Sequence, residues 1–283
     1  TLFRSGVIFR NILRSGIMCQ LLGMNCNTPT DITFSFEGFR RRAGLTDQHT
    51  DGFGIAFFEG KGVRIFRDNR PGASSPMADL ISQYKIKSFN VISHIRKATR
   101  GDVNLENTHP FIRELWGENW VFAHNGTVEG VRPCADCHYQ PIGTTDSEAA
   151  FCCIVSRLRE RFDKKPSEKE IFDTVVEITS DIATHGVFNF IMSNGHWMIA
   201  RCSTRLYYVT RKAPFSKALR DDDVEIDFSK YTTENDKVTI IATQPLTKNE
   251  NWIKMKNGGY VFFKNGELVE EIEGTLPDNQ SHV

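Results

Sequence analysis

The 283-residue sequence lacks two features that mark membrane and nucleic-acid-binding proteins. No uninterrupted apolar run approaches the roughly 20 residues that a helix needs to span a bilayer, which excludes a transmembrane helix. Neither sign of charge dominates, because 35 basic side chains are balanced by 35 acidic ones. The chain therefore has no overall electrostatic attraction to nucleic acids or anionic membranes. We expect a soluble protein with neither as a partner.

Cysteines are few, and their pattern gives no framework of pairs. Seven are spread through the chain, an odd number that is more typical of reduced thiols in the cytoplasm than of a secreted disulfide scaffold. Cys134 and Cys137 have a spacing that zinc sites use, but no second Cys-x-x-Cys or His-x-x-x-His is present to complete four ligands. We predict a loop there, no metal site, and a cytoplasmic protein.

The first eighteen residues differ from the rest of the chain. Residues 1–17 contain three arginines and no acid, set among apolar side chains. This pattern allows a basic amphipathic helix, and hence a membrane-surface anchor or a targeting segment. Because Met18 directly precedes Cys19, an upstream segment ahead of the true start is the interpretation we favour, with a self-removed propeptide as the second. We expect 1–18 to be absent from the active protein and 19–283 to form one domain.

After Cys19, short apolar segments of strand length flank two helical segments. Both helices open with a capping-box pattern, Thr145 with Glu148 and Ser167 with Glu170, and then repeat apolar residues at helical spacing. The predicted strands are 19–24, 54–58, 63–66, 89–95, 120–123, 188–192, 197–201, 206–210, 238–243, 258–263 and 267–272. Two central helices between blocks of strands predict helices layered on sheets.

Cys19 is the first of four candidate functional positions. If Met18 is removed, one residue carries both a thiol and an α-amine. Their reference pKa values are about 8.5 and about 7.7–8.0, so the amine can act as a base for the thiol near neutral pH. The alternative is a structural thiol in an apolar strand.

The other three positions are polar groups next to strands or at a helix start. Arg96 ends an apolar strand and can donate two hydrogen bonds to a carboxylate, unless it forms a surface salt bridge. The Asn125 amide and the Gly126 N–H can donate to one oxygen, the minimum for an oxyanion hole, unless the pair is a tight turn. Asp146 can bind a substrate ammonium, unless it only caps the helix.

Together with the segment 51–56 (Asp-Gly-Phe-Gly-Ile-Ala), and in this order, these segments resemble the class II glutamine amidotransferases. The resemblance extends from Cys19 to about Leu158 and is greatest to the stand-alone bacterial members of the YafJ type. It implies the α+β, four-layer αββα sandwich of the N-terminal-nucleophile hydrolases. It also implies the site residues, namely the nucleophile Cys19, the carboxylate contacts Arg96 and Thr99, the oxyanion hole Asn125 and Gly126, and the ammonium anchor Asp146.

Two positions depart from the pattern of the synthase-fused members. Lys97 stands where many of them have an aromatic residue, and Arg100 where a histidine is often found. These differences affect the rim of the pocket and hence the preferred leaving group.

The implied reaction is the release of ammonia from glutamine through a γ-glutamyl thioester, with no metal or organic cofactor. The ammonia then escapes or passes to a separate synthase subunit. Two alternatives remain. The same residues can cleave γ-glutamyl peptides or conjugates, which carry a larger leaving group. The protein is a non-catalytic binding module if the leader stays attached, because the nitrogen of Cys19 is then an amide and not a base.

Overall fold

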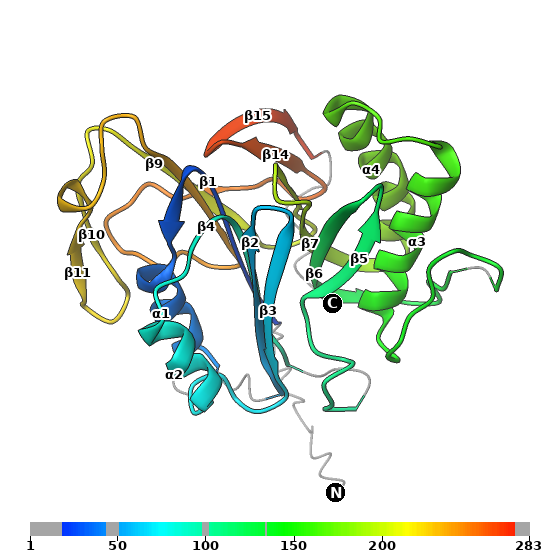
Figure 1. The fold of residues 1–283 in the computed structure, drawn as a ribbon, viewed down its shortest axis with the longest axis horizontal. Coiled ribbons are helices and arrows are strands. Elements are labelled where there is room, and N and C mark those ends of the chain that lie inside the picture. The colour runs from blue at the N-terminus through cyan, green and yellow to red at the C-terminus, as the bar shows by residue number, and fades with distance from the viewer. Residues whose placement is uncertain (1–18, 44–50, 98–101, 134, 275–283) are drawn as a thin grey trace, which may run out of the picture.

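The computed structural model describes residues 19–43, 51–97, 102–133 and 135–274. Two β-sheets face each other, and each is covered on its outer side by a pair of helices (Figure 1). This is the α+β, four-layer αββα sandwich that the sequence predicted. Among the described residues, no helix is both long and apolar enough to cross a membrane.

The first sheet has seven strands in the order β13-β9-β12-β1-β4-β2-β3, and all neighbours are antiparallel. Its strands are β1 (Gln20–Asp31), β2 (Phe53–Glu59), β3 (Gly62–Asp68), β4 (Lys87–Ile95), β9 (Tyr207–Lys212), β12 (Lys237–Ala242) and β13 (Ile253–Lys254). The helices α1 (Thr33–Arg41) and α2 (Pro76–Gln83) cover its outer face.

The second sheet has six strands in the order β15-β14-β8-β7-β6-β5, also antiparallel. Its strands are β5 (Phe111–Leu115), β6 (Glu118–Val128), β7 (Gly186–Ser193), β8 (Met198–Arg201), β14 (Tyr260–Lys264) and β15 (Glu267–Ile272). Its outer face is covered by α3 (Asp146–Arg161) and α4 (Glu168–Ile182). The short strands β10 (Lys217–Leu219) and β11 (Glu225–Asp227) pair only with each other.

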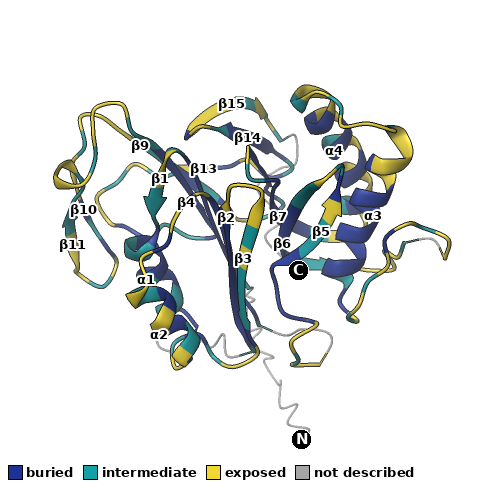
Figure 2. Cartoon of the chain, in the orientation of Figure 1, coloured by how far each residue is buried: buried dark blue, intermediate teal, exposed yellow. Residues whose placement is uncertain are grey.

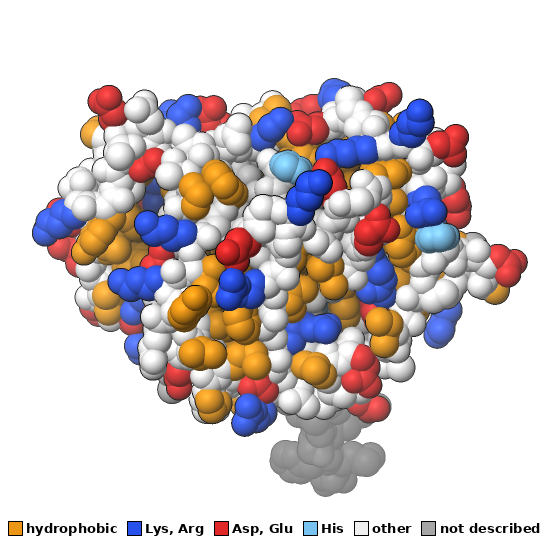
Figure 3. Space-filling model, in the orientation of Figure 1, with side chains coloured by type: hydrophobic (Ala, Val, Ile, Leu, Met, Phe, Trp, Pro, Cys, Tyr) orange, Lys and Arg blue, Asp and Glu red, His pale blue; other side chains and the backbone are white. Residues whose placement is uncertain are grey.

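The central strands are apolar on both faces because each face is buried. In β1, Leu21 belongs to the core between the sheets, whereas Leu22 and Met24 pack toward α1 and α2. Successive side chains of a strand point to opposite faces, so a strand buried on both sides is a continuous apolar run. Figure 2 shows these inner strands as buried, with the exposed residues gathered on outer helix faces and loops. In the view of Figure 3, positive and negative side chains are interspersed, as the balanced charge suggests.

The helix starts confirm one predicted capping box and correct the other. The Ser167 side chain accepts a hydrogen bond from the Glu170 N–H, and the Glu170 carboxylate accepts one from the Ser167 N–H, which completes the box. At α3, Thr145 accepts from the Glu148 N–H at 3.2 Å. The Glu148 carboxylate does not return to Thr145 but accepts from the Gly143 N–H at 2.7 Å. Only half of that box is present, because Glu148 anchors the preceding loop instead.

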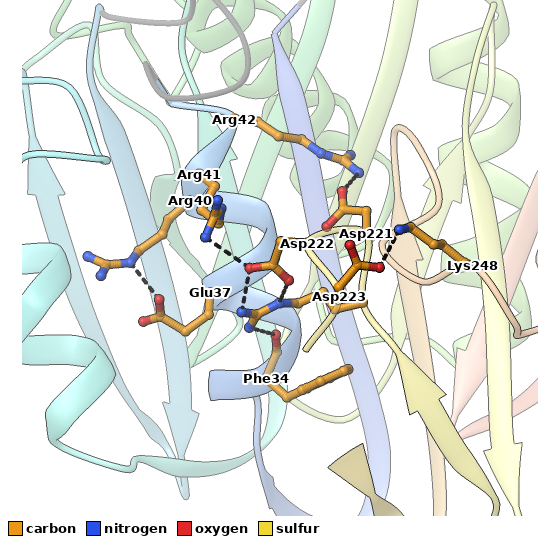
Figure 4. A network of polar contacts seen from close by, with 10 residues as sticks. Phe34, Glu37, Arg40, Arg41, Arg42, Asp221, Asp222, Asp223 and Lys248 are labelled. Carbon is orange, nitrogen blue, oxygen red and sulfur yellow. Dashed lines mark hydrogen bonds and ion pairs between the residues drawn. The ribbon is translucent and has the colours of Figure 1, made fainter. Parts of the chain in front are cut away.

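A network of arginines and aspartates holds the end of α1 against the segment between β10 and β11 (Figure 4). Arg41 pairs with Asp222 at 3.0 Å, and Arg42 pairs with Asp221 at 3.1 Å. Arg42 also donates to the carbonyl of Pro245, at 2.7 Å. This network fixes the segment that follows β12, and the same segment borders the beginning of β1.

Candidate active site

Cys19 lies directly before β1, half-buried at one end of the space between the two sheets. Its position is fixed by the first residues of β1, where the Leu21 N–H donates to the Thr243 hydroxyl at 2.8 Å. The thiol contacts the backbone just beyond β4. It donates to the Lys97 carbonyl at 3.2 Å, and the Lys97 N–H lies 3.1 Å from the sulfur. Leu21, two residues further on, belongs to the core between the sheets, and side chains two apart along a strand share a face, so Cys19 lies on the side of the inter-sheet space.

Burial raises the pKa of the Cys19 thiol to about 11, and this effect outweighs the lowering by the Lys97 N–H and by the positive charge of Arg96. The negative charge of Asp51 adds to the rise in the pKa. A thiol with such a pKa is protonated at neutral pH, whereas the thiolate is the nucleophilic form. Attack by this sulfur therefore requires a base at the moment of reaction.

Arg96 follows β4, and only 3% of it is exposed. Its backbone N–H donates to the Gly52 carbonyl at 2.8 Å, and its Nη1 donates to the Asp102 carbonyl at 2.9 Å. Burial lowers the pKa of Arg96, although a guanidinium keeps its charge in proteins. Arg96 is therefore not a surface residue, because its side chain is enclosed at the same end of the sandwich as Cys19.

Asn125 and Gly126 lie within β6, where they pair with Asn189 and Phe188 of β7, so they are not a turn. The Asn125 amide donates to the carbonyl of Cys19 itself. Gly126 has φ of 152°, and a Cβ there would lie 1.9 Å from the Val187 carbonyl oxygen. Only glycine fits this close approach between strands.

Asp146 is the first residue of α3, and the N-cap is its neighbour Thr145. The Asp146 carboxylate accepts from the Val128 N–H at 2.8 Å and from the Ser147 N–H at 2.9 Å. Val128 is two residues beyond Gly126 in β6, so Asp146 points toward the end of the strand that carries the Asn-Gly pair. The Ser147 N–H belongs to the first turn of α3, so Asp146 shares the capping of this helix with the N-cap Thr145.

Direct contacts thus join Cys19 with Asn125, and electrostatic interaction joins its thiol with Arg96. Asp146 approaches from the α3 side through Val128. Thr99 and Arg100 lie outside the described residues. Lys97 contacts the Cys19 thiol through its backbone carbonyl and N–H.

Asn189 supports the site but was not singled out in the sequence. It is fully buried, and its Nδ2 donates to the Asn125 carbonyl at 3.0 Å. Its Oδ1 accepts from the Ser203 N–H at 2.8 Å and from the Thr204 N–H at 3.0 Å. The feature of the sequence that could have identified Asn189 is its polar side chain within the apolar run of β7.

Two cavities differ in their relation to these residues. One of about 360 Å³ borders Asp146, with Val128, Gly143 and Thr144 in its wall. The other, of about 630 Å³, lies at the opposite end of the sandwich among hairpin turns, with Phe58, Trp116 and Gly195 in its wall. None of the predicted site residues that the structure describes lines the larger cavity.

The cysteines outside the site differ in their bonding. Among the described residues, no group of three or more His, Cys, Asp or Glu side chains is placed to hold a metal ion. Cys134 lies outside the described residues. Cys137 is disulfide-bonded, so the expectation of reduced thiols is wrong at that residue. The thiols of Cys19, Cys26, Cys152, Cys153 and Cys202 are free.

The fold and this arrangement of residues agree with comparisons to known proteins. A family model described as class II glutamine amidotransferases matches residues 18–282. A Haemophilus influenzae protein assigned to the glutamine amidotransferases is 68% identical over 260 residues, covering 92% of this chain and 88% of that protein. YafJ of Escherichia coli K12, assigned likewise, is 50% identical over 254 residues, covering 89% of this chain and all of YafJ. The chain belongs to the class II glutamine amidotransferases.

Solved structures show the same fold. The 2.0 Å crystal structure of a Pseudomonas aeruginosa protein classed as a glutamine amidotransferase has 41% identity and a TM-score of 0.71, covering 89% of this chain and all of that one. The glutamine phosphoribosylpyrophosphate amidotransferase of Bacillus subtilis has 14% identity and a TM-score of 0.59, and its match covers 90% of this chain and 49% of that one. At that identity the likeness concerns the fold alone.

Proposed function

We propose that the protein hydrolyses the γ-amide of glutamine, with Cys19 as its N-terminal nucleophile. The observation that carries this proposal is the contact of the Asn125 amide with Cys19 at the end of β6, beside the buried Arg96. A thiol, a positive charge and an amide donor therefore lie close together at the Cys19 end of the space between the two sheets. Membership of the class II glutamine amidotransferases supports glutamine as the donor.

In the proposed reaction the α-amine of Cys19 takes the thiol proton, directly or through one water, as the sulfur attacks the γ-carbonyl carbon. A base is needed because burial raises the pKa of this thiol to about 11. The Asn125 amide and the Gly126 N–H donate to the oxyanion, an interaction that is stronger in the transition state than in the ground state. The C–N bond then breaks and its nitrogen takes the proton, which releases ammonia. Water hydrolyses the γ-glutamyl thioester to glutamate and restores the thiol.

The two charged ends of the substrate have partners of opposite charge in this proposal. Arg96 binds the α-carboxylate together with Thr99, and Asp146 binds the α-ammonium. The protein backbone orients both of the described side chains, through the Asp102 carbonyl and the Val128 N–H. Fixed anchors of this kind convert binding energy into orientation of the reacting carbonyl. The ammonia leaves for solution or for a separate synthase subunit.

The mechanism requires residues 1–18 to be removed, because only a free α-amine can act as the base. A chain that keeps them binds its ligand without turning it over. Intact-mass measurement of active protein should therefore give a chain that starts at Cys19. Full activity from protein that retains the leader would exclude the α-amine as base.

The deciding experiment measures glutamate and ammonia released from glutamine, and glutamate released from glutathione and γ-glutamyl dipeptides, by protein that begins at Cys19. Equal amounts of glutamate and ammonia from glutamine would support the proposal. Cleavage of the peptides alone would replace ammonia by a larger leaving group at the same site. If the protein bound glutamine but hydrolysed none of these compounds, it would be a binding module.

A further inference from the structure

Asn107 is completely buried between two segments that flank the site. Its Nδ2 donates to the Asp102 carbonyl at 3.2 Å and to the Thr144 hydroxyl at 3.1 Å. Its Oδ1 accepts from the Thr144 N–H at 2.8 Å. The side chain therefore uses both polar atoms to bind Thr144, which is 37 positions away from Asn107 in the sequence.

Each end of this connection leads directly to one of the two charged anchors. The Asp102 carbonyl, which accepts from Asn107, also accepts from Nη1 of Arg96 at 2.9 Å. Thr144 stands two residues before Asp146, and the residue between them is the N-cap of α3. The Asn107 amide is thus connected to Arg96 through one shared carbonyl, and to Asp146 through the backbone of Thr144 and the N-cap residue.

The segment before α3 has little room to shift against Asn107. A Cβ on Gly143 would lie 2.3 Å from Oδ1 of Asn107 and 2.9 Å from the Glu106 carbonyl oxygen, so the backbones touch. On its other side, the Gly143 N–H donates to the buried carboxylate of Glu148 at 2.7 Å. The segment is held from both directions, which makes the position of Asp146 dependent on that of Asn107.

We propose that Asn107 is a positioning residue that sets the separation of Arg96 from Asp146. It thereby restricts good substrates to compounds that present a free carboxylate and a free ammonium on one carbon. This inference rests on the proposed roles of the two anchors. A small displacement of one anchor breaks the simultaneous fit of both charges, while a substrate with only one of the charges loses little.

The test compares glutamine with glutaramate, the same γ-amide without the α-ammonium. For Asn107→Ala we expect KM for glutamine to rise about tenfold, with kcat changed far less and glutaramate hydrolysis nearly unaffected. The selectivity for glutamine, measured as the ratio of the two kcat/KM values, should therefore fall about tenfold. Thr144→Val removes only the hydroxyl contact on an exposed residue and should lower the ratio less.

A matched control is Asn25→Ala, which removes another buried asparagine with contacts across strands, at the far end of the sandwich. It should lower the melting temperature and leave the selectivity unchanged. If Asn107→Ala and Thr144→Val both kept the wild-type ratio, Asn107 would only stabilise the fold and the inference would be wrong. Should Asn107→Ala not fold, Thr144→Val decides alone. A wild-type protein that hydrolysed no glutamine would instead overturn the proposed function, and the inference with it.

Discussion

Buried asparagines at the two ends of the sandwich differ in how completely their side chains are hydrogen-bonded. At the far end, the Asn25 Nδ2 donates to the Asn90 Oδ1 at 2.9 Å, and the Asn25 Oδ1 accepts from the Gly266 N–H at 2.7 Å. The Asn90 Nδ2 donates to the Gly195 carbonyl at 2.6 Å. Every polar side-chain atom of this pair has a partner, so the pair joins β1 and β4 to two hairpin turns and serves the fold.

At the end that carries Cys19, some buried polar side-chain atoms of the residues that the structure describes have no hydrogen-bond partner. Within the described part of the chain, Oδ1 of Asn125 is buried without a hydrogen-bond partner, and so are both ring nitrogens of His109. Leaving such a group unsatisfied costs about 1–3 kcal/mol, and native proteins tolerate this where function requires it. The larger cavity adjoins the end that holds Asn25 and Asn90. The partnerless groups found among the described residues at the Cys19 end are a carboxamide oxygen and an imidazole, whereas those next to the larger cavity are the indole N–H groups of Trp120 and Trp197 in the aromatic core.

The largest difference between the two ends should come from removing a thiol, either that of Cys19, directly before β1, or that of Cys26, within β1. Cys19→Ala should abolish glutamate release while stability changes by about 1 kcal/mol at most, because the side chain is small and only half-buried. Cys26→Ala, in the wall of the far cavity, should keep wild-type turnover. Glutamate release and thermal melts of both variants check this. Wild-type rates in Cys19→Ala would disprove the nucleophile assignment.

The asparagines give a second, smaller contrast. Asn125→Ala should cut kcat by roughly 10²–10³ with KM nearly intact, since its amide acts mainly on the oxyanion. Its melting temperature should fall less than that of Asn90→Ala, because the substitution also removes an unsatisfied buried oxygen. Asn90→Ala should leave kcat unchanged. If Asn125→Ala lowered only stability, with kcat intact in the folded protein, the oxyanion hole would lie elsewhere.

The charged anchors should affect substrate capture more than chemistry. Arg96→Lys keeps the charge but loses the two-pronged geometry, so KM should rise by about tenfold with a smaller change in kcat. Asp146→Asn should do the same with only a small fall in melting temperature, because an amide oxygen still accepts from the Val128 N–H although the contact with the Ser147 N–H is lost. Asp146→Ala loses that acceptor and should also melt earlier. Equal KM values for wild type, Arg96→Lys and Asp146→Asn would exclude both anchors.

Much of this architecture is predictable from local sequence patterns. The strand that leads to Arg96 and the helix that starts at Asp146 have clear signals, because burial on one or both faces dictates their apolar spacing. α1 was missed since Ile32 gives it no side-chain cap. α2 was missed although Ser75 and Pro76 form a helix start, because the helix has only eight residues.

The contacts that support the site, in contrast, are not predictable from local sequence patterns. Asn107 and Asn189 act on partners that are distant in the sequence, through carbonyls and N–H groups that every residue has. No residue type or spacing marks such contacts before the chain is folded. The same limit explains why Asn125 and Gly126 read equally well as a turn, since only the pairing of β6 with β7 decides between the two.

The smallest expected effect concerns acid stability. Burial, with nearby His94 adding to the effect, lowers the pKa of His109 well below its usual 6.5. The unfolded chain, whose histidine titrates near 6.5, therefore binds a proton before the folded one does as the pH falls. Stability from this residue is fully present above about pH 6.5 and is lost as the pH falls below that value. Melting temperatures measured from pH 7.5 to 5.5 should decline less steeply in His109→Gln than in wild type. Identical slopes in the two proteins would show that the buried histidine at the Cys19 end does not titrate on unfolding.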